Sequence, residues 1–94
     1  MRESAVESAI CTYARKHGIT PLKLSGQGAR GKADRMFMRQ GKVVFLEVKA
    51  PGKKPTDLQL RFLRQRRDDG FAAGWCDNIL EGMLFLRESF QLPE

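Results

Sequence analysis

The sequence has few of the residues from which disulfide, zinc and histidine-based sites are built. Its 94 residues include two cysteines, Cys11 and Cys76, which form neither a disulfide framework nor a zinc-ligand spacing. His17 is the only histidine, which excludes histidine-based nucleophiles. No apolar run approaches the roughly 20 residues needed to cross a bilayer. The charged N-terminus lacks the apolar core of a secretion signal, so we expect one cytoplasmic domain over residues 1–94 with no membrane segment.

Acidic residues are scarce in the middle of the chain. From Arg30 to Arg67, twelve Lys or Arg stand against three Asp or Glu, and the whole chain has a formal net charge of +6. A segregated basic stretch indicates a polyanionic partner, and nucleic acid is the commonest one. Charge alone does not separate a DNA-binding module from an enzyme, and a solvated basic face without special purpose is a third interpretation.

The spacing of apolar residues predicts an alternation of helices and strands. An apolar stripe at helical spacing predicts a helix over residues 3–16. Further on, the pattern predicts strands over 19–24, 34–39, 43–49 and 71–76, and helices over 57–69 and 79–88. The order is α-β-β-β-α-β with a terminal helix, which is typical of an α/β sandwich with a small mixed sheet flanked by helices.

The turn between the two middle strands decides which residues face each other. If Gln40 and Gly41 form a two-residue turn, Asp34 falls directly opposite Glu47, with Cβ atoms about 5 Å apart. Lys49, two residues beyond Glu47, then lies on the same face. A three-residue turn would shift the pairing by one residue and move Asp34 to the other face.

Two opposed carboxylates on an apolar sheet need a stabilising partner. The strand that carries Glu47 is apolar on both faces, so we expect it to be central and weakly screened by solvent. Either the two acids share a proton, or a divalent cation binds them, and oxygen ligands at this spacing suit Mg²⁺ or Mn²⁺. Lys49 could then hold a phosphate oxygen or orient a water for attack on phosphorus. The competing interpretation is an ordinary surface salt bridge between Glu47 and Lys49.

At these residues the chain resembles the PD-(D/E)xK nuclease superfamily, and within it the VRR-NUC branch of virus-type replication and repair nucleases. The matching stretches are "RESAVESAI", "GQGARGKADRMF", "VVFLEVKAPGKKPTDLQLRFL" and "DDGFAAGW". The resemblance implies a restriction-endonuclease-like fold and a stand-alone, phage-type nuclease acting in a bacterial host. One departure is Ala33, where the motif has a proline, but proline shapes the backbone and does no chemistry.

The resemblance also implies roles for individual residues. Asp34 and Glu47 would hold the metal together with the backbone carbonyl of Val48, and Lys49 would support the attacking water. An acidic residue on the first helix and a glutamine on the second helix would complete the catalytic set.

Glu3 and Glu7 are the candidates on the first helix. They lie one helical turn apart, and the periodicity does not decide between them. Favourable charge in the first turn of a helix is the alternative explanation for both. Gln59 is the candidate on the second helix, in the middle of its apolar face, where we expect it to position substrate or water. Its alternative is a capping box with Thr56 as N-cap.

Basic residues flank the predicted site on both sides. Arg30 and Lys32 come just before Asp34, and Lys53 and Lys54 follow the strand that ends with Lys49. We expect these four to contact DNA phosphates, which positions the backbone without identifying bases.

Other charged and aromatic residues suggest structural roles. Arg61, Arg64 and Arg67 fall on the side of the second helix that we expect to face solvent. Phe71 and Trp75 are predicted to belong to the core rather than to stack on bases.

Together these features predict a Mg²⁺- or Mn²⁺-dependent endonuclease that hydrolyses phosphodiester bonds in DNA. A chain of 94 residues offers little surface for a branched substrate, so we expect a homodimer with two sites. Stand-alone relatives resemble resolvases of four-way (Holliday) junctions, which makes such junctions the favoured substrate, with flap and plain duplex DNA as alternatives. A non-catalytic basic DNA-binding module is the rival function, and it would show steep salt dependence without any need for metal.

Overall fold

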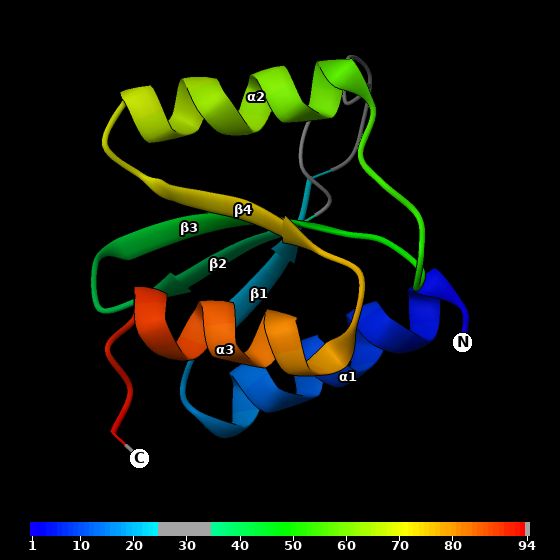
Figure 1. Cartoon of the computed structure of the whole chain (residues 1–94). Coiled ribbons are helices and arrows are strands. Elements are labelled where there is room, and N and C mark those ends of the chain that lie inside the picture. Colours follow the sequence, from blue (N-terminus) through cyan, green and yellow to red (C-terminus); the bar gives the residue numbers. More distant parts are fainter. Residues whose placement is uncertain (25–34, 94) are drawn as a thin grey trace.

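The computed structural model describes residues 1–24 and 35–93, and its elements follow the predicted order (Figure 1). They are α1 (Glu3–Lys16), β1 (Thr20–Lys23), β2 (Arg35–Arg39), β3 (Lys42–Val48), α2 (Asp57–Asp68), β4 (Ala72–Cys76) and α3 (Ile79–Ser89). The α/β class and the α-β-β-β-α-β order are therefore confirmed. None of the helices in the described ranges is long and apolar enough to cross a membrane.

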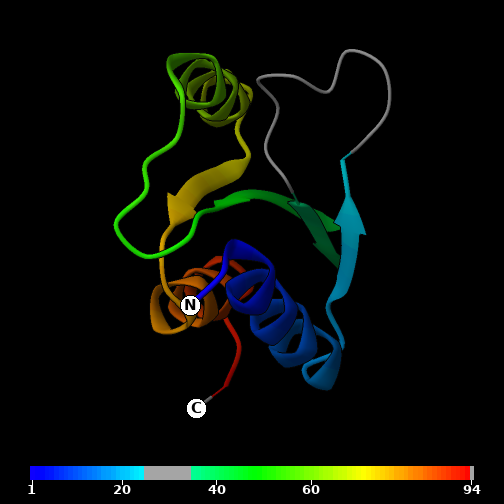
Figure 2. The ribbon, with the colours of Figure 1, turned by 90° about the vertical axis from the view of Figure 1, so that its right-hand side faces the viewer.

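The four strands form one mixed sheet in the order β1-β2-β3-β4. β1 pairs with β2 and β2 with β3 in antiparallel fashion, whereas β3 and β4 run parallel. α1 and α3 cover one face of the sheet and α2 covers the other (Figure 2). β3 is thus a central strand, as its apolar sequence predicted.

The β2–β3 hairpin has the predicted two-residue turn. Gln40 and Gly41 both have positive φ angles, 51° and 81°, which is the conformation of the hairpin turns that match strand twist. Arg39 pairs with Lys42, and the ladder continues to the pair of Arg35 and Leu46. The three-residue alternative is therefore wrong for the described part of the hairpin.

Side chains of β3 alternate between two apolar clusters. Val44, Leu46 and Val48 pack with residues of α1 and α3. On the opposite face Phe45 packs with Leu63 of α2. Alternation along the strand places Glu47 on the face of Phe45, beneath α2.

The close contact between α1 and α3 depends on Gly82. A Cβ at this position would overlap the side chain of Ile10 on α1 and would lie 3.2 Å from the sulfur of Cys76. The glycine therefore allows α3 to approach α1 and the sheet closely.

Candidate active site

Glu47 lies near the C-terminal end of β3, at the end of the sheet where the loop to α2 begins (Figure 1). Its side chain is fully buried, and it is the only charged residue with this degree of burial in the described ranges. Burial of an ionised carboxylate is costly unless charge or hydrogen bonding compensates it. Such a residue in the sheet interior indicates a role other than solubility.

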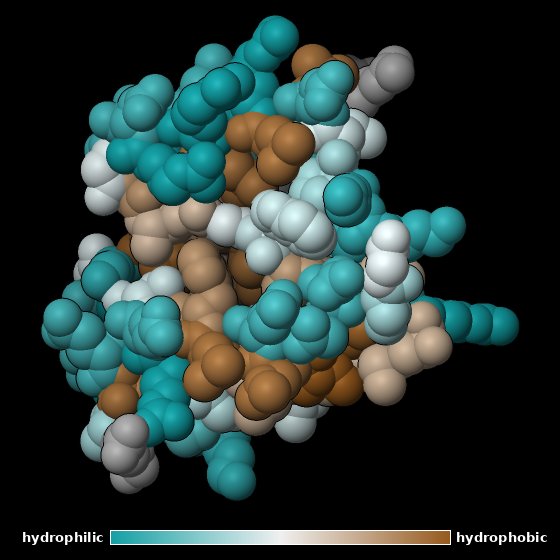
Figure 3. Space-filling view, in the orientation of Figure 1, coloured by the Kyte–Doolittle hydropathy of each residue, from teal (hydrophilic) through white to brown (hydrophobic). Residues whose placement is uncertain are grey.

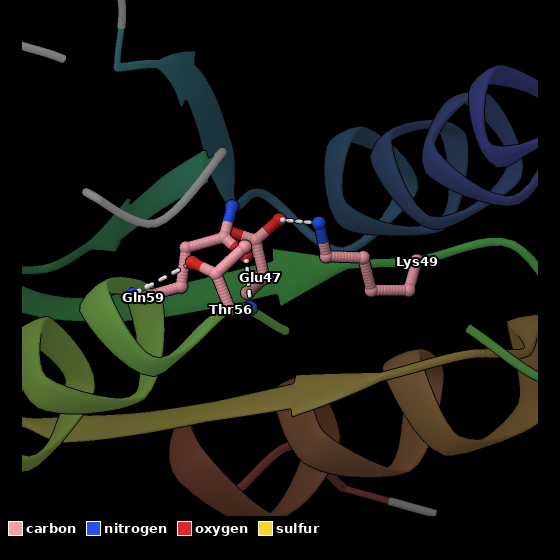
Figure 4. Close-up of polar contacts among 4 residues, drawn as sticks. All are labelled: Glu47, Lys49, Thr56 and Gln59. Carbon is pink, nitrogen blue, oxygen red and sulfur yellow. Dashed lines mark hydrogen bonds and ion pairs between the residues drawn. The ribbon is translucent and has the colours of Figure 1, made fainter. Parts of the chain in front are cut away.

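Lys49 supplies positive charge next to this carboxylate. Its Nζ lies 3.5 Å from Oε2 of Glu47, and only 16% of its side chain is exposed. Figure 4 shows the lysine side chain turned back toward Glu47 from the end of β3. The predicted salt bridge exists, but it is a largely buried pair, so the interpretation as an ordinary surface salt bridge is wrong.

The backbone beside this pair is held by β4. The backbone N–H of Lys49 donates to the carbonyl of Cys76 at 2.9 Å. Because successive residues of a strand point to opposite neighbours, the carbonyl of Val48 is directed to the β2 side. Among the described residues the β2 ladder ends at Leu46, so this carbonyl lies beyond it.

Three of the predicted site residues that precede β2 lie outside the residues that the structure describes. Asp34, Arg30 and Lys32 belong to residues 25–34, which are outside the described residues. Within residues 1–24 and 35–93 no three His, Cys, Asp or Glu side chains gather in a way that could hold a metal ion. A cation at Glu47 would therefore need oxygen ligands from the backbone, from solvent or from outside these ranges.

The two candidate acids of α1 lie in different surroundings. Oε1 of Glu7 accepts a hydrogen bond from Arg35 of β2 at 3.1 Å, and the pair is mostly buried. Glu3 is exposed. Arg35 pairs with Leu46, whose side chain faces α1 and α3, so Glu7 meets the sheet on the face opposite to Glu47. The structure therefore places Glu7 at the start of β2 and leaves Glu3 in solvent.

Comparison with known proteins identifies relatives of the chain and of its fold. No family model matches the chain. The chain is 42% identical to "Putative nuclease p44" of Acyrthosiphon pisum secondary endosymbiont phage 1 over 62 aligned residues. The aligned stretch covers 65% of this chain and 67% of the phage protein. A solved "VRR_NUC domain" superposes with a TM-score of 0.79 at 24% identity, over 90% of this chain and 94% of its own. A "VRR_NUC domain protein" superposes with a TM-score of 0.82 at 13% identity, and the superposition covers 100% of this chain and 92% of that protein.

The chain belongs to the VRR-NUC family of nucleases. The resemblance drawn from the motifs is thus confirmed, and the two structural similarities show that the fold is that of the VRR-NUC domain.

In this VRR-NUC domain Gln59 forms the capping box that was its alternative explanation. The Oε1 atom of Gln59 accepts the N–H of Thr56 at 2.9 Å, and the hydroxyl of Thr56 accepts the N–H of Gln59 at 3.2 Å (Figure 4). The side-chain NH₂ group of Gln59 makes no hydrogen bond to another described residue. The cap therefore uses the oxygen and leaves the two amide protons for other contacts, and a role with substrate stays a prediction.

The two predicted phosphate-binding lysines of the VRR-NUC domain lie in the loop after β3. Lys53 and Lys54 are exposed. Two hydrogen bonds stabilise this loop. The backbone N–H of Lys53 donates to the carbonyl of Ala50 at 2.9 Å, and the N–H of Gly52 donates to a carboxylate oxygen of Asp77 at 3.1 Å. In Figure 2 the loop that joins β3 to α2 passes outside β4.

Sequence reasoning missed the position of Trp75. This residue pairs with Glu47 in the parallel β3–β4 ladder, so the two side chains are neighbours on the face that α2 covers. Trp75 is 39% exposed and Phe71 is 41% exposed, so the prediction that both belong to the core is wrong. For Trp75 the error arises because β4 is an edge strand, a position that its short apolar sequence did not indicate.

Proposed function

We propose that this VRR-NUC domain is a divalent-metal-dependent endonuclease that hydrolyses phosphodiester bonds in DNA. The observation that carries the proposal is the buried carboxylate of Glu47 with the ammonium of Lys49 at 3.5 Å, near the C-terminal end of the central strand β3. The curated relative is described as a nuclease, and the basic middle of the chain suits a polyanionic substrate.

The metal would be Mg²⁺ or Mn²⁺, held by Asp34, Glu47 and the backbone carbonyl of Val48. Two carboxylates and a carbonyl form an all-oxygen donor set, which these hard cations prefer. The hairpin register supports this set of ligands. The described ladder ends with Arg35 opposite Leu46, and one further step of the same register would pair Asp34 with Glu47. When bound, the cation would neutralise charge on the scissile phosphate and favour ionisation of a water molecule.

Lys49 would act directly on the substrate. Its buried ammonium is held next to Glu47, so it would bind a non-bridging phosphate oxygen and stabilise the negative charge that develops during attack. The amide protons of Gln59 would donate to the phosphate or to the attacking water. Glu7, held by Arg35, is favoured over the exposed Glu3 as the acid on α1.

The preferred substrate would be branched DNA, with the four-way junction first, cut by a homodimer inside the bacterial host of a phage. A two-fold dimer would present two sites for paired cuts on opposite strands. The phage relative supports the setting. Arg30, Lys32, Lys53 and Lys54 would grip phosphates around each site.

A cleavage assay tests the proposal. Wild-type protein and Lys49→Ala are incubated with end-labelled duplex, flap and four-way junction DNA in Mg²⁺, in Mn²⁺ or in EDTA. We expect wild-type cleavage with either metal and none in EDTA, and we expect Lys49→Ala to bind DNA without cutting it. Light scattering on the same samples reports whether the protein is a dimer. Tight, salt-sensitive binding with no cleavage in either metal would instead identify a non-catalytic DNA-binding module.

A further inference from the structure

One flank of α2 carries a row of arginines that the proposed reaction does not use. Arg61, Arg64 and Arg67 are exposed, and with Asp57 and Leu60 they line a groove of about 390 Å³. Figure 3 shows hydrophilic side chains gathered over α2, in contrast to the apolar surface over α3. The groove is separate from the buried pair of Glu47 and Lys49, neither of which lines it.

The spacing and anchoring of this row make it a defined surface. Residues three apart on a helix are neighbours, and at 1.5 Å per residue the row extends about 9 Å along α2. Arg67 donates to the carbonyl of Ala73 at 2.9 Å, which fixes one end of the row against β4. Arg66 is used differently: it lies over the ring of Phe62 at 5.0 Å and pairs with Asp69 at 3.1 Å.

The row is not neutralised by the protein itself. No ion pair within 4.0 Å joins Arg61 or Arg64 to an acid in the described part of the chain, although Asp57 lines the same groove. Like charges three residues apart destabilise a helix. Asp57 lies in the first turn of α2, where the helix dipole favours its charge. A row of this kind costs the free protein stability that an anionic ligand would restore.

We infer that Arg61, Arg64 and Arg67 form a second phosphate-binding surface, which takes the sugar–phosphate backbone of DNA away from the cleavage site. The inference rests on the proposed function and extends it to the path of the substrate. Guanidinium groups bind phosphate through two parallel hydrogen bonds, and a 9 Å row suits successive phosphates of one strand. α2 begins at the cap of Thr56 and Gln59 over β3 (Figure 4), so the row leads outward from the site along the helix.

The test is the salt dependence of DNA binding in EDTA, where cleavage cannot contribute. Arg61→Gln/Arg64→Gln removes two charges and keeps Arg67, because Arg67 bonds to β4. The slope of log affinity against log salt should become shallower by about 0.9 for each lost contact, or about 1.8 in total. The matched control is Lys16→Gln/Lys42→Gln, which removes the same charge from exposed positions outside α2 and should change the slope much less.

A thermal melt separates the binding role from a structural one. Loss of like charges should leave the Tm of Arg61→Gln/Arg64→Gln unchanged or higher, since glutamine is as good a helix former as arginine. A lower Tm with an unchanged salt slope, or a slope change equal to the control's, would overturn the inference. Arg64→Gln alone, with half the slope change expected, decides the matter if the double variant does not fold. Absence of cleavage by the wild type would refute the nuclease proposal without affecting these binding results.

Discussion

Glu47 and Lys49 form an ion pair of 3.5 Å in which the carboxylate is fully buried and the lysine side chain is 16% exposed. They lie two residues apart on β3 and therefore on the same face. Surface pairs of this type contribute little to stability, and a buried pair commonly costs more in desolvation than it returns. The pair is therefore weak evidence for a role in folding, and the proposed catalytic role gives another reason for its presence.

The double variant Glu47→Gln/Lys49→Met should be inactive yet as stable as the wild type or more stable. Replacement of a buried ion pair by neutral residues of similar shape is often neutral or stabilising by about 1–4 kcal/mol. Urea unfolding measures the stability, and the cleavage assay measures the activity. Each single variant should be less stable than the double, because it leaves one charged partner in the buried site. A double variant several kcal/mol less stable than the wild type would show that the pair serves the fold.

Glu7 and Glu3 give a matched pair of variants on one helix. Glu7 bonds to Arg35 at 3.1 Å, while Glu3 lies in solvent. Glu7→Gln should reduce cleavage by roughly tenfold or more. It should lower the free energy of unfolding by more than the roughly 1 kcal/mol of an exposed pair, because Arg35 then loses a charged partner in a mostly buried site. Glu3→Gln should change neither quantity. Equal activity in both variants would remove α1 from the catalytic set.

Local sequence patterns predicted the parts of the fold that depend on local chemistry. The Gln40–Gly41 turn formed as expected, and the Thr56–Gln59 cap formed as the alternative interpretation of Gln59 proposed, because each is decided within four residues. The two apolar faces of β3 were also visible in its sequence. The partial exposure of Trp75 was not visible, since it depends on β4 being an edge strand beside β3.

The same distinction applies to the candidate site. The spacing of Glu47 and Lys49 predicted a shared face, and the structure added that both are largely out of water. Periodicity could not choose between Glu3 and Glu7, because the choice depends on how α1 crosses the start of β2. Asp34 lies outside the described residues, so its place opposite Glu47 stays a prediction.

Gly82→Ala should destabilise the protein although alanine is normally the better helix former. Alanine in a helix interior is favoured over glycine by about 1 kcal/mol. Here its Cβ would overlap Ile10 and press on the sulfur of Cys76, and overpacking of this kind costs about 1–3 kcal/mol. Urea unfolding should therefore show a net loss. Ser8→Ala, on the exposed side of α1, is the control and should be neutral or slightly stabilising.

Cys76 should make stability fall at high pH. Burial is the main cause that raises the pKa of this thiol from its usual 9.0 to about 11. The unfolded chain therefore loses the thiol proton at lower pH than the folded protein, so stability present below pH 9 is lost as the pH rises toward about 11. The slope from one proton is at most about 1.4 kcal/mol per pH unit.

Cys76→Ala isolates this contribution from every other source of pH dependence, because the rest of the chain is the same in both proteins. The variant leaves a small cavity and should be less stable than the wild type at pH 8. The difference between the two proteins should narrow between pH 9 and 11, because only the wild type loses the Cys76 contribution. Burial also raises the pKa of Cys11, which both proteins retain, so that effect cancels in the comparison. A difference that stays constant from pH 8 to pH 11 would show that the thiol at position 76 ionises alike in the folded and unfolded chains.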